Sequence, residues 1–168
     1  MELPVGAKEI IKRLLAAGHD AYLVGGSIRD MLLGRPPHDH DIVTTATPYQ
    51  VMELFDRVVP VGLQHGTVTV IEKGFQAEVT SIIDLCQDLR RRDFTINAMA
   101  MDLKGKIYDC FGGREDLQHK VIRAVGQAQH RFREDPLRLL RAVRQAVVLD
   151  FTIDDKTGIS IVENSYLL

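Results

Sequence analysis

Leu23-Val24-Gly25-Gly26-Ser27-Ile28-Arg29-Asp30 is the stretch that decides the fold of this 168-residue chain. Residues 21–24 are short and apolar, Gly25-Gly26 allows a sharp turn, and residues 27–33 have the composition of a helix that ends at Gly34. Such a strand, turn and helix bring backbone N–H groups close to a bound phosphate. Arg29 supplies a cation for that phosphate, although a glycine pair can also be plain turn punctuation.

Two aspartates follow a Pro-Pro loop in the run Asp39-His40-Asp41, which leads into the apolar residues 42–44. Residues two apart in an extended chain point to the same side, so both carboxylates can share hard cations such as Mg²⁺. Two solvated turn acids are the plain alternative. A histidine–aspartate metal phosphohydrolase is another, because His38 and His40 flank the pair. That class needs further ligands on helices, whereas this site leads into a strand. We therefore expect His40 to be packed or solvated.

The next feature is a predicted β-hairpin that carries a third acid. Residues 67–71 and 75–82 are rich in β-forming side chains and meet at Lys73-Gly74. Glu78 lies on the second strand and completes a three-carboxylate metal site if this strand is adjacent to the aspartate strand. A strand acid that faces solvent is the default, and the sequence does not reveal which strands are neighbours.

The rest of the pattern predicts an α+β chain with a mixed sheet and flanking helices. Further helices are expected around residues 10–15 and at 48–55, 92–101 and 136–148, and a further strand at 107–109. In the last helix an apolar stripe is formed by Leu137, Leu140, Val143 and Val147. Because the chain becomes helical and rich in arginine after about residue 117, we expect a head over residues 1–120 and the start of an all-α region over 121–168.

Two guanidinium groups precede the predicted helix at 92–101, in the run Arg91-Arg92-Asp93. The planar fork of arginine matches phosphate oxygens. Asp93 and Asn97 lie four residues apart on this helix. Asn97 can hold a sugar hydroxyl, although a helix cap or a core hydrogen bond explains it equally well.

A second charged run, Glu134-Asp135-Pro136-Leu137-Arg138, begins the last helix. In a functional interpretation, Asp135 accepts from the exocyclic amine of a base while Arg138 donates to ring acceptors, so that protein groups replace a template base. Arg141 and Arg144 would then meet phosphates or an RNA backbone. Capping acids and a solvated basic face are the alternative.

Composition and net charge narrow the classes of protein to which this chain can belong. A net charge of −2 excludes an overall basic coat, so nucleic acid must be met by local patches such as residues 120–144. Cys86 and Cys110 lack the spacing of a zinc site, which favours a reduced chain. The longest apolar runs fall short of the roughly 18 residues of a membrane helix, and we expect a cytoplasmic protein.

Taken together, these motifs closely resemble those of the class II tRNA nucleotidyltransferases, in the family's order. They comprise residues 23–48, 62–70, 91–101, 109–117 and 131–144. The resemblance implies a polymerase-β-like head and transfer of CMP alone, or of CMP and AMP, from CTP or ATP to the tRNA 3′ end without a template. It implies Mg²⁺ at Asp39 and Asp41, and Glu78 is the third catalytic acid if its strand lies beside theirs. The nucleotide contacts that we expect are Gly25, Gly26, Arg29, Arg92, Asp93, Asn97, Glu134, Asp135, Arg138, Arg141 and Arg144.

Three further expectations follow from the family. Bacterial poly(A) polymerases share these motifs, but they carry a basic and aromatic cluster around Gly-Leu-Gln-His-Gly-Thr that this chain lacks, which favours tRNA as substrate. Residues 79–90 leave little room for the long loop of full CCA-adding members, as in members that add only CC. The chain also stops at Leu168, where relatives continue into helical neck, body and tail, so we expect a fragment that binds tRNA poorly. An RNA-binding module without catalysis is the non-enzymatic alternative.

Overall fold

The computed structural model describes residues 2–168, which form two compact units. The first contains the chain up to residue 88 together with residues 100–108, and the second contains residues 89–99 and 109–168. Residues 89–99 and 109–120, which the sequence assigns to the head, therefore belong to the second compact unit. The division into domains near residue 120 stays a prediction.

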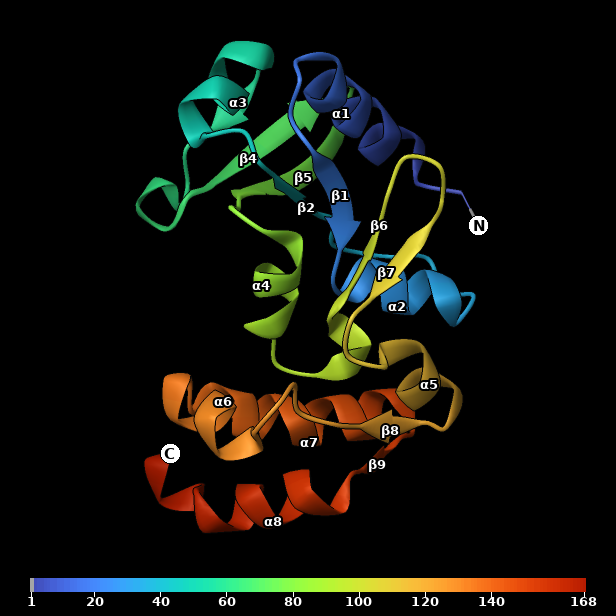
Figure 1. Cartoon of the computed structure of the whole chain (residues 1–168), viewed down its shortest axis with the longest axis vertical. Helices are drawn as coiled ribbons and strands as arrows, with labels where there is room; N and C mark the ends of the chain where they lie inside the picture. Colours follow the sequence, from blue (N-terminus) through green and yellow to red (C-terminus); the bar gives the residue numbers. More distant parts are fainter. Residues whose placement is uncertain (1) are drawn as a thin grey trace. The chain divides into compact units, whose positions relative to one another are not determined.

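The first unit is built around a mixed sheet with the strand order β3-β4-β5-β2-β1-β6-β7 (Figure 1). The strands are β1 (Ala21–Val24), β2 (Asp41–Thr44), β3 (Val58–Val59), β4 (Thr67–Glu72), β5 (Phe75–Ser81), β6 (Met99–Met101) and β7 (Ile107–Asp109). Strands β2 and β5 are parallel, whereas β1 is antiparallel to β2 and β6, and β4 is antiparallel to β3 and β5. The predicted α+β class with a mixed sheet is confirmed.

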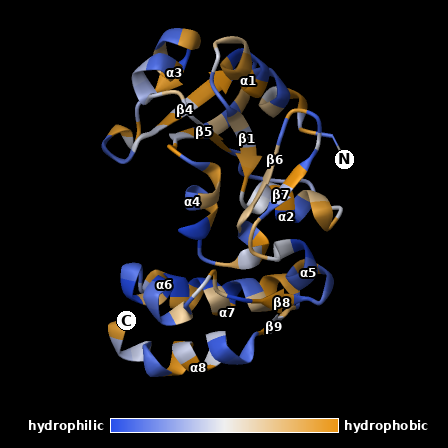
Figure 2. Ribbon diagram, viewed as in Figure 1, coloured by the Kyte–Doolittle hydropathy of each residue, from blue (hydrophilic) through white to orange (hydrophobic). Residues whose placement is uncertain are grey.

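Short helices flank this sheet. They are α1 (Val5–Ala16), α2 (Gly26–Leu32), α3 (Pro48–Leu54), the 3₁₀ turn η1 (Leu63–His65) and α4 (Leu85–Arg90). Helix α1 packs on β1 and β5 through its buried Ile10, Ile11 and Leu14. Figure 2 colours much of β4 as hydrophobic, and Val68, Val70, Ala77 and Val79 of β4 and β5 are buried in the core.

Local sequence signals explain where these elements begin and end. Helix α3 begins with a capping box between Thr47 and Gln50, followed by Pro48 in the first turn. The β4–β5 hairpin turns at Lys73 and Gly74, both with positive φ. Both elements lie where the sequence predicts them, within a residue or two.

The second unit consists of helices and a two-stranded parallel sheet. Its elements are η2 (Thr95–Asn97), α5 (Gly113–Gln118), β8 (Val121–Ile122), α6 (Ala128–Glu134), α7 (Leu137–Leu149), β9 (Thr152–Ile153), α8 (Asp155–Glu163) and η3 (Ser165–Leu167). Helix α6 packs on α7 and α8. No helix among residues 2–168 is long and apolar enough to span a bilayer.

The predicted helix at 92–101 is wrong. The segment forms only the 3₁₀ turn η2 and then the strand β6, whose three residues are all buried. Phe94 pairs with Ala124 in an isolated β-bridge, and β6 pairs with β1. Tertiary pairing therefore overrides the helical propensity of this segment, because extended backbone satisfies its hydrogen bonds elsewhere.

Helix α7 is confirmed, but its apolar stripe does not face the core. Leu137, Leu140, Val143 and Val147 are 47–76% exposed, whereas the buried face carries Leu139, Ala142 and Leu149. The stripe is therefore a surface feature of the second unit.

Gly113 makes the closest backbone approach in the second unit, and it generates a stability prediction. A Cβ atom there would lie 2.2 Å from the Thr95 carbonyl oxygen, so Gly113→Ala forces backbone to move. We expect a loss of about 1–3 kcal/mol in the free energy of unfolding, measured by urea denaturation.

Gly158→Ala is the matched control for this substitution. Gly158 lies inside α8, and a Cβ atom there meets only Ile153 at 3.9 Å. Alanine should therefore be neutral or stabilise by about 0.5–1 kcal/mol. Equal effects of the two substitutions would contradict the close packing of Gly113 on Thr95.

Candidate functional site

The backbone of the Asp39-His40-Asp41 run is held from two sides. The hydroxyl of Ser27, which is 3% exposed in α2, donates to the carbonyl oxygen of Asp39 at 2.5 Å. The backbone N–H of Glu78 donates to the carbonyl oxygen of His40 at 2.9 Å. The aspartates therefore project from a fixed backbone rather than from a free loop. The sequence does not indicate this role of Ser27, because a serine in a helix gives no signal of its partner.

The strand register brings Glu78 beside the aspartates. Strands β2 and β5 are parallel, and Asp41 pairs with Glu78. Paired residues on neighbouring strands point to the same face of a sheet, so these two side chains share a face. The adjacency that the sequence left open is thus present. The function of Glu78 in metal binding stays a prediction.

A divalent cation fits this place by donor chemistry and strand position. Three carboxylates gather at the start of β2 and on the neighbouring strand, and oxygen donors are what Mg²⁺ prefers. Among residues 2–168, no three His, Cys, Asp or Glu side chains form a closed cluster for a metal ion. The carboxylates are therefore neighbours in the fold without converging on one point.

The glycine turn lies at the same end of the sheet. Val24, the last residue of β1, pairs with Asp41, so the turn follows directly beside the aspartates. Gly25 has φ +77°, a backbone conformation that residues other than glycine rarely adopt. The guanidinium of Arg29 lies close to Gly26 and forms an ion pair with Asp30 at 2.8 Å. The glycine turn, Arg29 and Asp41 of the first unit therefore lie at the same end of the sheet.

His40, between the two aspartates, packs rather than binds. Its ring lies 4.5 Å from that of Phe75, centroid to centroid. Burial lowers the pKa of His40, and the charges of Asp39 and Asp41 offset part of this effect. Of the two predicted states, packed or solvated, the contact with Phe75 shows the packed one.

Asp93 is the hub of the predicted nucleotide contacts in the second unit. Its side chain is only 7% exposed. One carboxylate oxygen accepts from the Phe94 N–H at 2.8 Å and from the Asn97 amide at 2.9 Å. The other accepts from Nε and Nη2 of Arg141, at 2.9 and 2.6 Å. Both oxygens are therefore used inside the protein, and Asp93 acts on its neighbours Asn97 and Arg141.

Asn97 is also held by a residue that the sequence analysis did not consider. The Asn97 amide donates to the Gln145 side chain at 3.2 Å. Gln145 lies one helical turn after Arg141 on α7, so the same face of α7 holds both Asp93 and Asn97. That i,i+4 spacing was the available signal, but it is too common to single out a glutamine.

Glu134, Asp135 and Arg138 form a connected group where α6 ends and α7 begins. Glu134 bridges two cations, with Arg131 at 2.6 Å and Arg138 at 3.0 Å. Arg138 also donates to the Arg91 carbonyl oxygen at 2.9 Å. Asp135 accepts from the Leu137 N–H at 3.0 Å, a capping bond at the start of α7. The structure thus brings these three predicted residues together and explains why α7 begins here.

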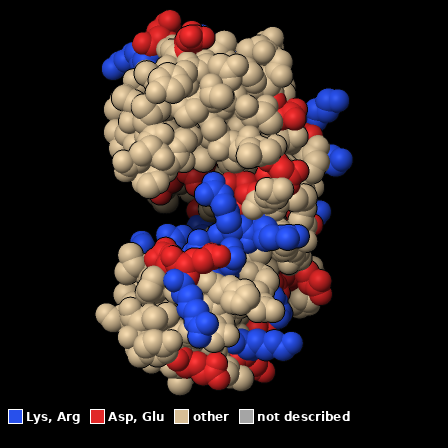
Figure 3. Space-filling model, turned by 60° about the vertical axis from the view of Figure 1, so that its left-hand side comes forward, with Lys and Arg blue, Asp and Glu red and all other residues tan. Residues whose placement is uncertain are grey.

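The remaining predicted cations are Arg92, which is half-buried, and Arg144, which is exposed on α7. Figure 3 shows basic side chains gathered over the second unit with acidic ones between them. Part of this positive charge is already neutralised within the protein by Glu134 and Asp93. The net positive charge of the second unit is therefore smaller than its number of arginines indicates.

Comparison with known proteins identifies the family. The model of the poly(A) polymerase head domain matches residues 21–83 and 76–123, more than half of the chain. This chain belongs to the poly(A) polymerase head-domain family. The matched region includes β1 through β7, and with them the glycine turn, the aspartate pair and Glu78.

Several relatives of this chain are CCA-adding enzymes. The chain is 46% identical over 180 aligned positions to the CCA-adding enzyme of Lactiplantibacillus plantarum, covering 96% of this chain and 44% of that protein. The Bacillus stearothermophilus CCA-adding enzyme in complex with CTP superimposes with a TM-score of 0.95 at 47% identity, over 99% of this chain and 45% of the other.

A tRNA nucleotidyltransferase complexed with a primer tRNA and an incoming ATP analogue gives a TM-score of 0.83 at 33% identity, over 94% of this chain and 50% of the other. The chain thus spans half or less of the length of these relatives. The resemblance to class II tRNA nucleotidyltransferases is confirmed.

The Asp93 hub yields a testable prediction. Asp93→Asn removes the charge that Arg141 meets and places an amide donor among existing donors. Because the Arg141 side chain is 55% exposed, solvent screens part of the loss. We expect unfolding to become easier by about 1–2 kcal/mol in urea denaturation.

Arg144→Gln, at an exposed arginine of the same helix, should change stability by less than about 0.5 kcal/mol. The double variant Asp93→Asn/Arg141→Gln should be less destabilised than the sum of the single variants. Strict additivity would show that the ion pair contributes nothing.

Proposed function

We propose that this chain is a template-independent tRNA nucleotidyltransferase that adds CMP from CTP, or CMP and AMP from CTP and ATP, to the tRNA 3′ end. One observation carries the proposal: the Asp41–Glu78 register, which places a third acid beside the aspartate pair next to a glycine turn. The family match and the 46% identity to a CCA-adding enzyme support the same reaction.

Mg²⁺ is the proposed cofactor. Nucleotidyltransferases of this family generally use a divalent metal ion, and Asp39 and Asp41 would hold it, with Glu78 beside them. When bound, the ions would lower the pKa of the attacking 3′ hydroxyl and stabilise the leaving pyrophosphate. The chain supplies no side-chain nucleophile in this scheme, because the tRNA hydroxyl attacks the α-phosphate directly.

The chain's own residues position and select the nucleotide. Gly25 and Gly26 would let the triphosphate approach backbone N–H groups, with Arg29 as a cation beside them. In the second unit, Arg92, Asn97, Arg141 and Arg144 would meet ribose and phosphates. Asp93 would act through Asn97 and Arg141, both of which it holds.

Base selection is proposed for Glu134, Asp135 and Arg138. One oxygen of Asp135 is used by the helix cap, which leaves the other to accept from an exocyclic amine. Glu134 and the Arg91 carbonyl orient the Arg138 guanidinium, so its remaining donor meets the base edge in a fixed geometry. The predicted all-α region at residues 121–168 would thereby select between CTP and ATP.

CC addition is the favoured product over full CCA addition. Only residues 82–84 connect β5 to α4, which leaves no long loop there. The 180 aligned positions with the Lactiplantibacillus enzyme exceed the 168 residues of this chain, so that enzyme has residues without a counterpart here. The family model also matches in two stretches that overlap at residues 76–83, close to this connection.

A bacterial poly(A) polymerase is the alternative enzyme, and a non-catalytic RNA-binding module is the other. The matching family is named after poly(A) polymerases. The similar proteins, however, are a CCA-adding enzyme and a tRNA nucleotidyltransferase complexed with a primer tRNA. We favour tRNA for that reason. Since tRNA is the substrate, we also propose that the chain works in the cytoplasm.

An extension assay tests this function. The chain is incubated with Mg²⁺ and a tRNA that lacks its CCA end, with CTP and ATP offered singly and together. We expect two cytidines from CTP and no further addition when ATP is present. One added adenosine would contradict the CC-only product, and long A tails would indicate a poly(A) polymerase. Absence of all extension at saturating tRNA would contradict the enzymatic proposal.

CTP binding tests the metal assignment separately. We expect removal of Mg²⁺ to weaken CTP binding by about tenfold or more, and Asp39→Asn/Asp41→Asn to bind CTP weakly whether or not Mg²⁺ is present. Glu53→Gln removes one negative charge from exposed α3 and should leave the Mg²⁺ dependence intact. If the aspartate variant keeps that dependence, the metal is held elsewhere. Calorimetric titration gives these affinities.

A further inference from the structure

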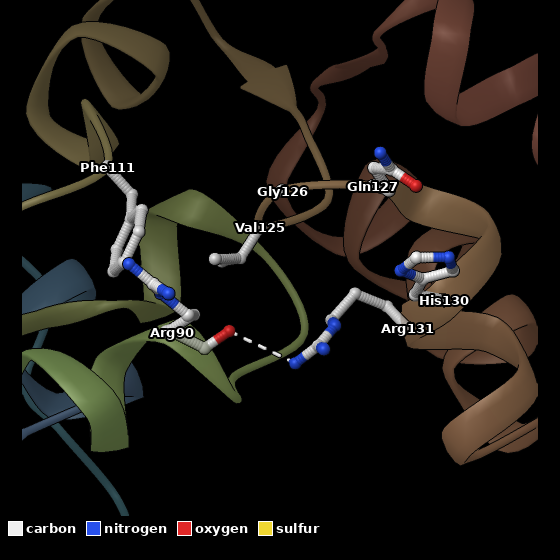
Figure 4. Close-up of a pocket in the computed structure, with 7 residues that line it drawn as sticks. All are labelled: Arg90, Phe111, Val125, Gly126, Gln127, His130 and Arg131. Carbon is white, nitrogen blue, oxygen red and sulfur yellow. Dashed lines mark hydrogen bonds between the residues drawn. The ribbon is translucent and has the colours of Figure 1, made fainter.

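A pocket of about 360 Å³ lies within the second unit, and its lining includes none of the residues assigned to the metal or the nucleotide (Figure 4). Its walls come from the end of α4, the loop between β7 and α5, the link from β8 to α6, and α6 itself. The lining residues are Arg90, Phe111, Val125, Gly126, Gln127, His130 and Arg131. Its volume falls at the lower end of the roughly 300–1,000 Å³ of small-ligand sites, enough for one small unit of a polymer.

The frame of the pocket is fixed by internal bonds. Arg131, whose side chain is 15% exposed, donates to the Arg90 carbonyl oxygen at 3.1 Å and pairs with Glu134 at 2.6 Å. The Val125 N–H donates to the Asp93 carbonyl oxygen at 3.0 Å, and Val125 is buried. Arg131 is therefore structural, and the pocket keeps its shape without a ligand.

The other polar side chains of the pocket are unused. Within residues 2–168, the Arg90 guanidinium, the Gln127 amide and the His130 imidazole make no hydrogen bond or ion pair, and the half-buried Phe111 ring has no aromatic partner. Figure 4 shows Arg90 and Phe111 on one side, with Gln127 and His130 on the other. None of the lining residues is acidic, so an anion is not repelled from within.

This combination fits one ligand chemistry. A guanidinium matches a phosphate, an aromatic ring offers a stacking face to a base, and an amide can both donate to and accept from a base edge. A free triphosphate would bring more negative charge than one unpaired arginine balances. We propose that this pocket holds one nucleotide of single-stranded RNA, with its base on Phe111, its phosphate on Arg90 and its base edge at Gln127. The proposed function supplies the identity of that RNA as substrate.

Binding of a short RNA tests the pocket. The probe is a fluorescein-labelled single-stranded RNA pentanucleotide, followed by anisotropy with EDTA and without triphosphates. Phe111→Ala should weaken binding about tenfold and leave its salt dependence unchanged, because stacking carries no charge. Arg90→Gln should weaken binding and lower the slope of log K against log salt by about 0.7, because one phosphate contact is lost.

Arg114→Gln is the matched control, since it removes the same charge from an exposed position on α5 outside the pocket. It should change neither affinity nor slope. If Phe111→Ala unfolds, Phe111→Leu keeps the apolar volume, and it should still weaken binding because the stacking face is lost. Thermal unfolding checks each variant.

Three results would overturn the pocket: no RNA binding by the unsubstituted chain, unchanged affinity in the Arg90 and Phe111 variants, or an equal loss in Arg114→Gln. CTP binding with Mg²⁺ is measured on the same samples. If the unsubstituted chain does not bind CTP but shows the expected RNA effects, the result contradicts the proposed function and leaves the pocket proposal intact. Normal CTP binding without those RNA effects contradicts the pocket alone.

Discussion

The parallel pairing of β2 with β5 is the constraint on which the site of the first unit depends. It sets Glu78 opposite Asp41. In the same pairing the Glu78 N–H donates to the His40 carbonyl oxygen. A shift of one residue in this register would turn Glu78 to the other face of the sheet. The buried Ser27 hydroxyl adds a second anchor at Asp39. Three acids can be kept close despite their mutual repulsion because the backbone, rather than the side chains, fixes their positions.

The second unit relies on a different interaction, a buried carboxylate whose oxygens are fully used. Asp93 collects Phe94, Asn97 and Arg141, and Gly113 allows the neighbouring Thr95 backbone to approach closely. Such a hub orients side chains at little entropic cost when a ligand arrives, because their rotamers are already restricted. Selection of a base by amino acids in place of a template requires this kind of preorganisation, since a misplaced guanidinium would accept more than one base edge.

Local signals in the sequence predicted much of the fold. Strands β1 and β2 and the Lys73–Gly74 hairpin follow from short apolar runs and glycine turns. The segment 92–101 was predicted as a helix because its pairing partners, Ala124 and β1, lie far away in the chain. The exposed stripe of α7 was invisible for the same reason, since periodicity shows that a face is apolar but not whether anything covers it. The acids and arginines of the site were identifiable by type and spacing, whereas Ser27 and Gln145 act through partners distant in sequence.

We propose that Asp39 and Asp41, held by Ser27 and β5, bind the metal ions of nucleotidyl transfer. A crystal structure with Mn²⁺ and a non-hydrolysable CTP analogue tests it most directly, because the anomalous signal of manganese locates each ion. We expect an ion at about 2.0–2.3 Å from a carboxylate oxygen of each aspartate, in contact with the triphosphate. An ion bound to other residues, or a triphosphate bound without any ion at the aspartates, would contradict it.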